Sequence, residues 1–173
     1  VNMKAGEIDP SESITDSVGL DKAYASENKI FIGADTMFVA GTASFGDAVD
    51  DVSIPFGRTD RTKRYEQASM ALAKSPQVTR VVGHSLGGAV SLQIAQQHGL
   101  VSRTYGAPVM SFSGGDRYRG KFDPVSMFDY GAKTKLVIGN PHGYSGLADK
   151  SYKPPSNVGK NSYDKNGVVN MYR

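Results

Sequence analysis

The chain has no cysteine, which excludes a disulfide framework, a thiol nucleophile and a thiolate metal site. It also lacks any apolar run near the length of about 20 residues that a membrane-spanning helix needs. No charged stretch followed by an apolar one opens the sequence, so no secretory signal is expected there. Histidine is scarce, with three in 173 residues. Any chemistry that needs an imidazole therefore has few candidates.

The overall composition, with 39% hydrophobic and 21% charged residues, is ordinary for a soluble globular domain. The length favours a single domain over residues 1–173. We expect a core at about 29–144, an N-terminal extension over 1–28 and a basic, loop-rich tail over 145–173. The sequence starts with Val1, as a mature protein, a domain or a processed fragment of a larger protein would.

Positive charge gathers in the tail, where five basic residues and one acidic residue follow from Lys150 onward. Such a tail could make peripheral contact with an anionic membrane or lipid surface. A solvated tail is the simpler interpretation. No nucleic-acid partner is expected.

Residues 81–89 read VVGHSLGGA and contain a G-x-S-x-G pattern centred on Ser85. An apolar run at 78–82, interrupted by Thr79 and Arg80, precedes the pattern, and apolar residues at helical spacing follow it to position 95. This context of strand, sharp turn and helix is typical of a nucleophile elbow, in which the serine has a strained backbone. Side chains at Gly83 and Gly87 would collide with the neighbouring strand or helix. The alternative is a glycine-rich turn with an incidental serine.

The remaining pattern predicts an α/β fold with a central, mostly parallel sheet flanked by helices. Strands are expected over 29–33, 36–40, 78–82, 100–105, 117–122 and 135–138. Helices are expected over 11–26, capped by Ser11 or Ser13, over 61–74, and from the elbow to about Gln97 with Gly99 as C-cap. Active groups should then lie at the C-terminal ends of the strands.

A serine nucleophile needs a base. His84 is next to Ser85 and its side chain should point away, as a packing residue or a wall of the substrate site. His98 lies near the end of the elbow helix, roughly 20 Å from Ser85 and beyond hydrogen-bond reach. His142, in a Gly-Asn-Pro-His-Gly-Tyr loop after an apolar strand, is therefore the predicted base. The alternative is a loop histidine with no role.

The acid that orients the base should lie between Ser85 and His142 in the chain. Asp116 sits in a turn where Asp is expected for local backbone reasons. Asp123 follows the predicted strand 117–122 directly and precedes a proline that favours extended backbone, so it is the preferred acid. Asp129 is the second choice.

An oxyanion hole needs two donors. The backbone N–H of Leu86 should supply one, and the segment Gly41-Thr42-Ala43 after an early strand should supply the other through Thr42. The same segment could be an ordinary turn. In the loop after the acid, Val125, Met127 and Phe128 could line an acyl pocket or belong to the core.

Four segments resemble the fungal-type class 3 lipases, and they span about 29–144. They are FVAGT at 38–42, VVGHSLGGA at 81–89, TYGAP at 104–108, and DPV at 123–125 followed by His142. The resemblance implies an α/β-hydrolase fold, a Ser85–Asp123–His142 triad and hydrolysis of glycerol or phospholipid esters, with no metal or cofactor. The family's oxyanion hydroxyl corresponds to Thr42. Ala40 stands where the family usually has arginine, and the stretch after Thr42 is short for a helical lid, as in a smaller esterase.

Two other functions fit the same sequence. The first is a catalytically silent binding or assembly domain that retains the fold. The second is acyl transfer or thioester hydrolysis by the same triad.

Overall fold

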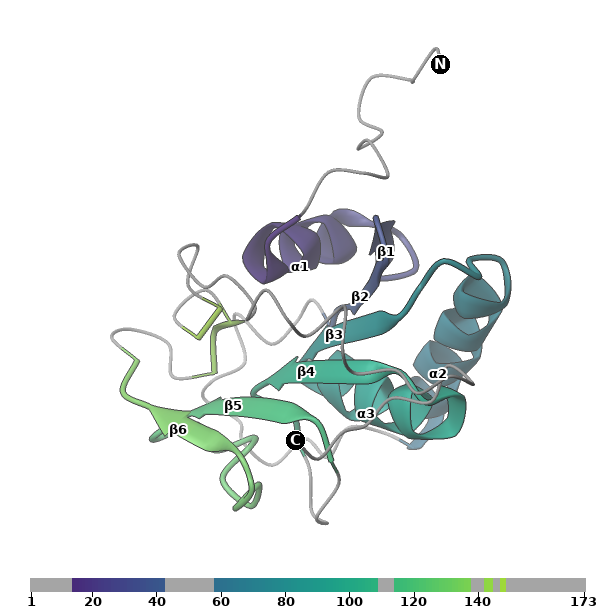
Figure 1. Ribbon diagram of the computed structural model, residues 1–173. Coiled ribbons are helices and arrows are strands. Elements are labelled where there is room, and N and C mark those ends of the chain that lie inside the picture. Colours follow the sequence, from purple (N-terminus) through teal and green to yellow (C-terminus); the bar gives the residue numbers. More distant parts are fainter. Residues whose placement is uncertain (1–13, 43–57, 109–113, 138–141, 145–146, 149–173) are drawn as a thin grey trace.

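The computed structural model describes residues 14–42, 58–108, 114–137, 142–144 and 147–148. Three helices and six strands follow one another along these ranges (Figure 1). In chain order they are α1 (Asp16–Ala25), β1 (Ile30–Gly33), β2 (Thr36–Val39), α2 (Arg58–Ala73), β3 (Arg80–His84), α3 (Leu86–His98), β4 (Val101–Tyr105), β5 (Asp116–Gly120) and β6 (Lys133–Lys135). No helix within these ranges is long and apolar enough to cross a membrane.

The strands form one sheet in the order β1-β2-β3-β4-β5-β6. The β1–β2 pair is antiparallel, and the four pairs from β2 to β6 are parallel. The predicted mixed α/β architecture with a mostly parallel sheet is therefore confirmed. Because parallel strands end at the same edge, the residues that follow β2, β3, β4 and β5 are brought together there.

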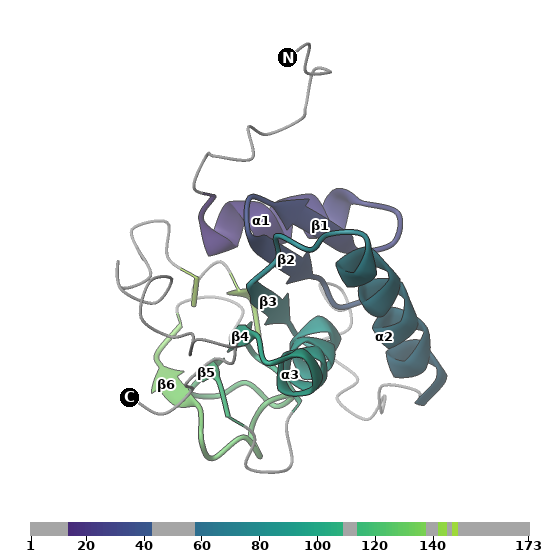
Figure 2. The ribbon, with the colours of Figure 1, turned by 45° about the vertical axis from the view of Figure 1, so that its right-hand side comes forward.

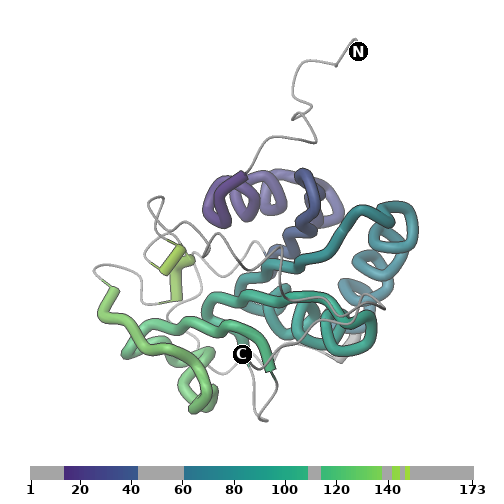
Figure 3. The backbone as a smooth tube through the Cα atoms, viewed as in Figure 1, coloured from purple at the N-terminus to yellow at the C-terminus, as the bar shows by residue number. Residues whose placement is uncertain are grey.

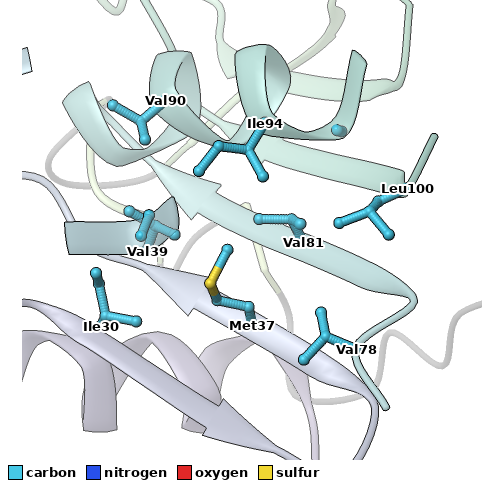
Figure 4. Close-up of a cluster of buried hydrophobic side chains, with 10 residues drawn as sticks. Ile30, Met37, Val39, Val78, Val81, Val90, Ile94 and Leu100 are labelled. Carbon is cyan, nitrogen blue, oxygen red and sulfur yellow. The ribbon is translucent and has the colours of Figure 1, made fainter. Parts of the chain in front are cut away.

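Helices cover both faces of the sheet, with α1 on one side and the contacting pair α2 and α3 on the other (Figures 1 and 2). Alternate strand residues point to opposite faces. Met37 and Val39 belong to the cluster on the α2–α3 side (Figure 4). Phe38, between them, belongs to the cluster on the α1 side, which also contains Leu20 and Ala23. Each face thus has its own apolar core.

A buried carboxylate joins α1 to the middle of the sheet. Asp16, in the first turn of α1, accepts hydrogen bonds from Arg80 of β3 at 2.7 Å and from the Tyr105 hydroxyl of β4 at 2.7 Å. Arg103 of β4 is 3.4 Å from the same carboxylate. Ion pairs of this kind are buried and multiply bonded, so removing one partner leaves an uncompensated charge. The cluster fixes where α1 lies on the sheet.

The ends of several elements differ from the sequence prediction. Thr15, rather than Ser11 or Ser13, caps α1, and its hydroxyl accepts from the Val18 N–H at 3.3 Å. The strand predicted over 117–122 is β5, which begins at Asp116 and ends at Gly120, so Phe122 lies in the following turn and is 71% exposed. The last strand covers Lys133–Lys135 rather than 135–138.

Some predictions lie outside the described residues. They concern residues 1–13 with the predicted caps Ser11 and Ser13, Ala43 of the predicted oxyanion segment, residues 138–141 before His142, and most of the tail over 145–173. Of the tail, Leu147 and Ala148 are described, and both pack in the cluster on the α1 side. Figure 3 shows the short pieces 142–144 and 147–148 between α1 and the β5–β6 part of the sheet.

Candidate active site

Ser85 occupies the sharp turn between β3 and α3. Its backbone angles are φ 55° and ψ −130°, which L residues rarely adopt, and the residue is fully buried. Such a conformation costs about 1–3 kcal/mol and persists only where the surroundings enforce it. Here the Ser85 N–H donates to the Tyr105 carbonyl at 3.0 Å, which ties the turn to β4.

The two glycines of the G-x-S-x-G pattern are required for close packing. A Cβ atom at Gly83 would overlap the Gly87 backbone and the Ser91 side chain. A Cβ atom at Gly87 would overlap the backbone of Val39 in β2. The predicted collisions are therefore confirmed, and the strand–turn–helix context of the elbow is present.

Three predicted residues meet at this turn. The His142 Nε2 atom lies 3.0 Å from Ser85 Oγ, and its Nδ1 atom lies 3.0 Å from both carboxylate oxygens of Asp123. All three residues are buried, with at most 3% of their surface exposed. A hydroxyl, an imidazole and a carboxylate in this sequence of contacts can pass a proton from the hydroxyl to the imidazole.

The Asp123 carboxylate is held by its own loop as well. The Val125 N–H donates to Oδ1 at 2.9 Å, and the Ser126 hydroxyl donates to Oδ2 at 2.5 Å. Burial by itself would raise the pKa of Asp123. The hydrogen bond and charge of His142, followed by the bonds from Ser126 and Val125, outweigh burial and lower that pKa below its usual value. The carboxylate therefore stays ionised opposite the imidazole.

The two other candidate acids have different partners. Asp129 is buried against Arg117, whose Nε atom donates to it at 3.0 Å. Asp116 binds Arg103 at 3.0 Å and Lys133 at 2.8 Å. The structure thus brings Asp123 to His142. Asp129 instead pairs with a β5 arginine, and Asp116 of β5 pairs with basic side chains of β4 and β6.

His84 packs against His142, with the ring centroids 4.9 Å apart. Its Nδ1 atom is 2.6 Å from the Tyr24 hydroxyl, and its Nε2 atom is 2.7 Å from the His142 carbonyl oxygen. Burial, followed by the nearby charge of His142, lowers the pKa of His84 to about 3, so the ring is neutral. The structure packs its ring against the His142 ring, and its predicted contact with substrate stays a prediction. His98, at the end of α3, is exposed.

The segment after β2 passes directly beside Ser85. A Cβ atom at Gly41 would lie 2.9 Å from Ser85 Cβ, so only glycine allows this approach. Thr42 follows and is half-buried. Leu86 is the first residue of α3, where the N–H has no acceptor within its own helix. The two predicted oxyanion donors therefore lie on segments that flank Ser85.

The loop after Asp123 presents apolar side chains. Val125 is half-buried, and Met127 and Phe128 are 49% and 52% exposed. They lie within five residues of the carboxylate along the chain. Their predicted role in an acyl pocket stays a prediction. Within the described ranges, no group of three or more His, Asp or Glu side chains is placed to hold a metal ion.

Sequence reasoning missed Tyr24. It is not among the site residues predicted from the sequence, yet its hydroxyl contacts both His84 and the Gly41 N–H. A tyrosine on an apolar helix face is a signal of such contacts, because a buried phenol needs hydrogen-bond partners.

Comparison with known proteins gave one structural likeness to report. No family model matches the chain, and no curated protein matches it. Among solved structures, the chain is similar to the crystal structure of a lipase from Rhizopus microsporus var. chinensis, at 23% sequence identity and a TM-score of 0.37. The match covers 56% of this chain and 49% of the lipase, so the chain spans about half of that protein's length.

Proposed function

We propose that this protein is a serine hydrolase of the α/β-hydrolase fold that cleaves carboxylic esters with an apolar acyl group. The observation that carries the proposal is the buried series of contacts from Ser85 Oγ to His142 Nε2 and from His142 Nδ1 to Asp123, each at 3.0 Å. The order serine, acid, histidine along the chain and the elbow between a central strand and its helix support the fold assignment.

In the first half of the reaction, Ser85 Oγ attacks the ester carbonyl carbon while His142 Nε2 accepts the hydroxyl proton. The ionised Asp123 stabilises the imidazolium that forms. The carbonyl oxygen becomes an oxyanion, which the Leu86 N–H and the Thr42 backbone or hydroxyl stabilise. His142 then gives its proton to the departing alcohol, and an acyl-serine remains.

In the second half, a water molecule attacks the acyl-serine. His142 takes a proton from that water, and as the tetrahedral intermediate collapses it returns the proton to Ser85 Oγ, so that the carboxylic acid is released and the hydroxyl restored. The apolar residues after Asp123 support an apolar acyl group as substrate, and lipid esters or small esters both belong to this class. No step needs a metal or cofactor.

A fluorophosphonate probe tests the proposal, because an activated serine displaces its fluoride and forms a stable phosphonate ester. The purified full chain is labelled, and the modified peptide is identified by mass spectrometry, alongside turnover of short-chain and long-chain p-nitrophenyl esters. We expect labelling at Ser85 that is lost in Ser85→Ala and in His142→Ala. Absence of labelling and turnover in a folded sample would overturn the proposal and favour a silent binding domain.

A further inference from the structure

A line of three hydrogen bonds joins Gly41, on one side of Ser85, to His142, on the other side, and does not include Ser85 itself. The Gly41 N–H is 3.2 Å from the Tyr24 hydroxyl oxygen. The Tyr24 hydroxyl is 2.6 Å from His84 Nδ1, and His84 Nε2 is 2.7 Å from the His142 carbonyl oxygen. One end of the line is the predicted oxyanion segment, and the other end is the main chain of the base.

The partners fix the direction of every bond in this line. A carbonyl oxygen can only accept, so His84 Nε2 must carry the hydrogen. In a neutral imidazole the other nitrogen then accepts, so the Tyr24 hydroxyl donates to Nδ1. The Tyr24 oxygen in turn accepts from the Gly41 N–H. A single arrangement of hydrogens therefore satisfies all three contacts.

The groups around His84 keep that arrangement stable. The His84 ring contacts three other rings, those of Tyr24 in α1 and of His142 and Tyr144 in the segment 142–144. The charge of Asp123, in the loop after β5, also acts on the pKa of His84. Burial of the ring prevents protonation in the ordinary pH range, and burial also raises the pKa of Tyr24 to about 12. The line would break if His84 gained a second proton, because Nδ1 could no longer accept.

Packing reinforces the hydrogen bonds. The rings of Tyr24 and Tyr144 stack at 5.5 Å with planes 5° apart, and the rings of His84 and His142 lie 4.9 Å apart. The Tyr144 hydroxyl points to another partner, Asp21, at 2.5 Å on the exposed side of α1. Of these two stacked tyrosines, Tyr24 has its hydroxyl in the line of hydrogen bonds and Tyr144 does not.

We propose that Tyr24 and a neutral His84 are positioning residues that hold the oxyanion segment and the base in one geometry around Ser85. This inference rests on the proposed function. Neither residue touches the reacting atoms, and each acts by fixing a main-chain group of the machinery: the Gly41 N–H and the His142 carbonyl. A shift of about 1 Å in such a group can lower a rate about 100-fold.

Activity measurements on hydroxyl-deletion variants test the role. Tyr24→Phe is compared with Tyr144→Phe, a matched control that removes a hydroxyl of the same cluster from outside the line. We expect Tyr24→Phe to lower kcat for a p-nitrophenyl ester about tenfold or more with little change in KM, and Tyr144→Phe to keep kcat within about twofold. Equal kcat values in the two variants would overturn the positioning role.

A second variant covers the case in which one substitution disturbs folding. Since His84→Leu removes both the acceptor for the Tyr24 hydroxyl and the donor to the His142 carbonyl, the double variant Tyr24→Phe/His84→Leu should lose little more than the worse single variant. Melting temperatures are measured for all variants, so that activity is compared among folded proteins. Fully additive losses in kcat would contradict a connected line.

Nitrogen NMR of ¹⁵N-histidine-labelled protein tests the hydrogen arrangement without any substrate. We expect His84 to carry hydrogen on Nε2 only and to show no titration from about pH 8 to about pH 4. Hydrogen on Nδ1, or titration near the ordinary histidine pKa, would overturn the inference alone. Failure of the fluorophosphonate to label the wild type would instead overturn the proposed function, and the catalytic significance of the line with it.

Discussion

The Nδ1 atom of His142 is equidistant from the two carboxylate oxygens of Asp123, at 3.0 Å from each. The same two oxygens accept bonds from the Val125 N–H and the Ser126 hydroxyl. The carboxylate is therefore fixed by three donors from two segments of the chain. This arrangement makes Asp123, and not Asp129, the acid on which activity should depend.

Asp123→Asn should lower kcat/KM by about 10⁴-fold, because an amide can donate to Nδ1 and hold His142 in the wrong tautomer. Steady-state hydrolysis of a p-nitrophenyl ester measures the loss. Asp129→Asn is the matched control. It leaves Arg117 without its buried counter-ion, so we expect a loss of about 3 kcal/mol in unfolding free energy with kcat retained in the folded fraction. The reverse pattern would assign the acid to Asp129.

The lowered pKa of Asp123 makes the stability of the fold sensitive to acid. A carboxyl group whose pKa is lower in the folded state stabilises the fold at pH values above its pKa in the unfolded chain. For Asp123 that unfolded-state pKa is near the ordinary 3.8. That contribution disappears as the pH falls through the folded-state pKa. Urea unfolding should therefore show a decline below about pH 4 that is shallower in Asp123→Asn. Identical slopes in the two proteins would refute the prediction.

The elbow glycines can be tested against a glycine in open space. Gly87→Ala should abolish probe labelling of Ser85, because the new methyl group collides with the Val39 backbone. Gly99→Ala is the control, since Gly99 has φ 64° and no atom of the described residues lies within 4 Å of an added Cβ. We expect it to cost about 1 kcal/mol of stability through its left-handed backbone and to keep labelling intact. Thermal unfolding and mass spectrometry measure both effects.

The proposed oxyanion role of the Thr42 hydroxyl can be tested separately from that of its backbone N–H. Thr42→Val preserves shape and the N–H but removes the hydroxyl, so kcat should fall about 100-fold if the hydroxyl binds the oxyanion. Thr42→Ser restores the hydroxyl and should recover most of the rate. If Thr42→Val keeps the wild-type kcat, only the backbone donors of this segment contribute.

The elbow and the architecture could be predicted because their signals are local. The G-x-S-x-G pattern, the apolar run before it and the helical spacing after it all occur within about twenty residues around Ser85. His142 followed from the scarcity of histidine. Strand ends were predicted less well, since the turn at Phe122 depends on how the chain pairs with β6, and pairing is not a property of a single segment.

Contacts between distant residues that belong to no recognised motif could not be predicted. The choice among three aspartates depends on Arg117 and Arg103, which neutralise two of them within the fold. Tyr24 is 60 positions from His84 in the chain, and Asp16 is 64 positions from Arg80. A single sequence has no pattern that pairs such residues, although burial of a polar group always requires that some partner exist.

The anchoring of α1 by Asp16 has a practical consequence for dividing the chain. All of the recognisable motif segments lie between 29 and 144, so a shortened version starting at Lys29 would retain each of them. It would nevertheless lose Leu20 and Ala23 from the core beside Phe38, and it would leave Arg80 and Arg103 without the carboxylate that joins them. The smallest unit that can be expected to fold and react therefore begins before Thr15, well upstream of the first residue that any motif search would select.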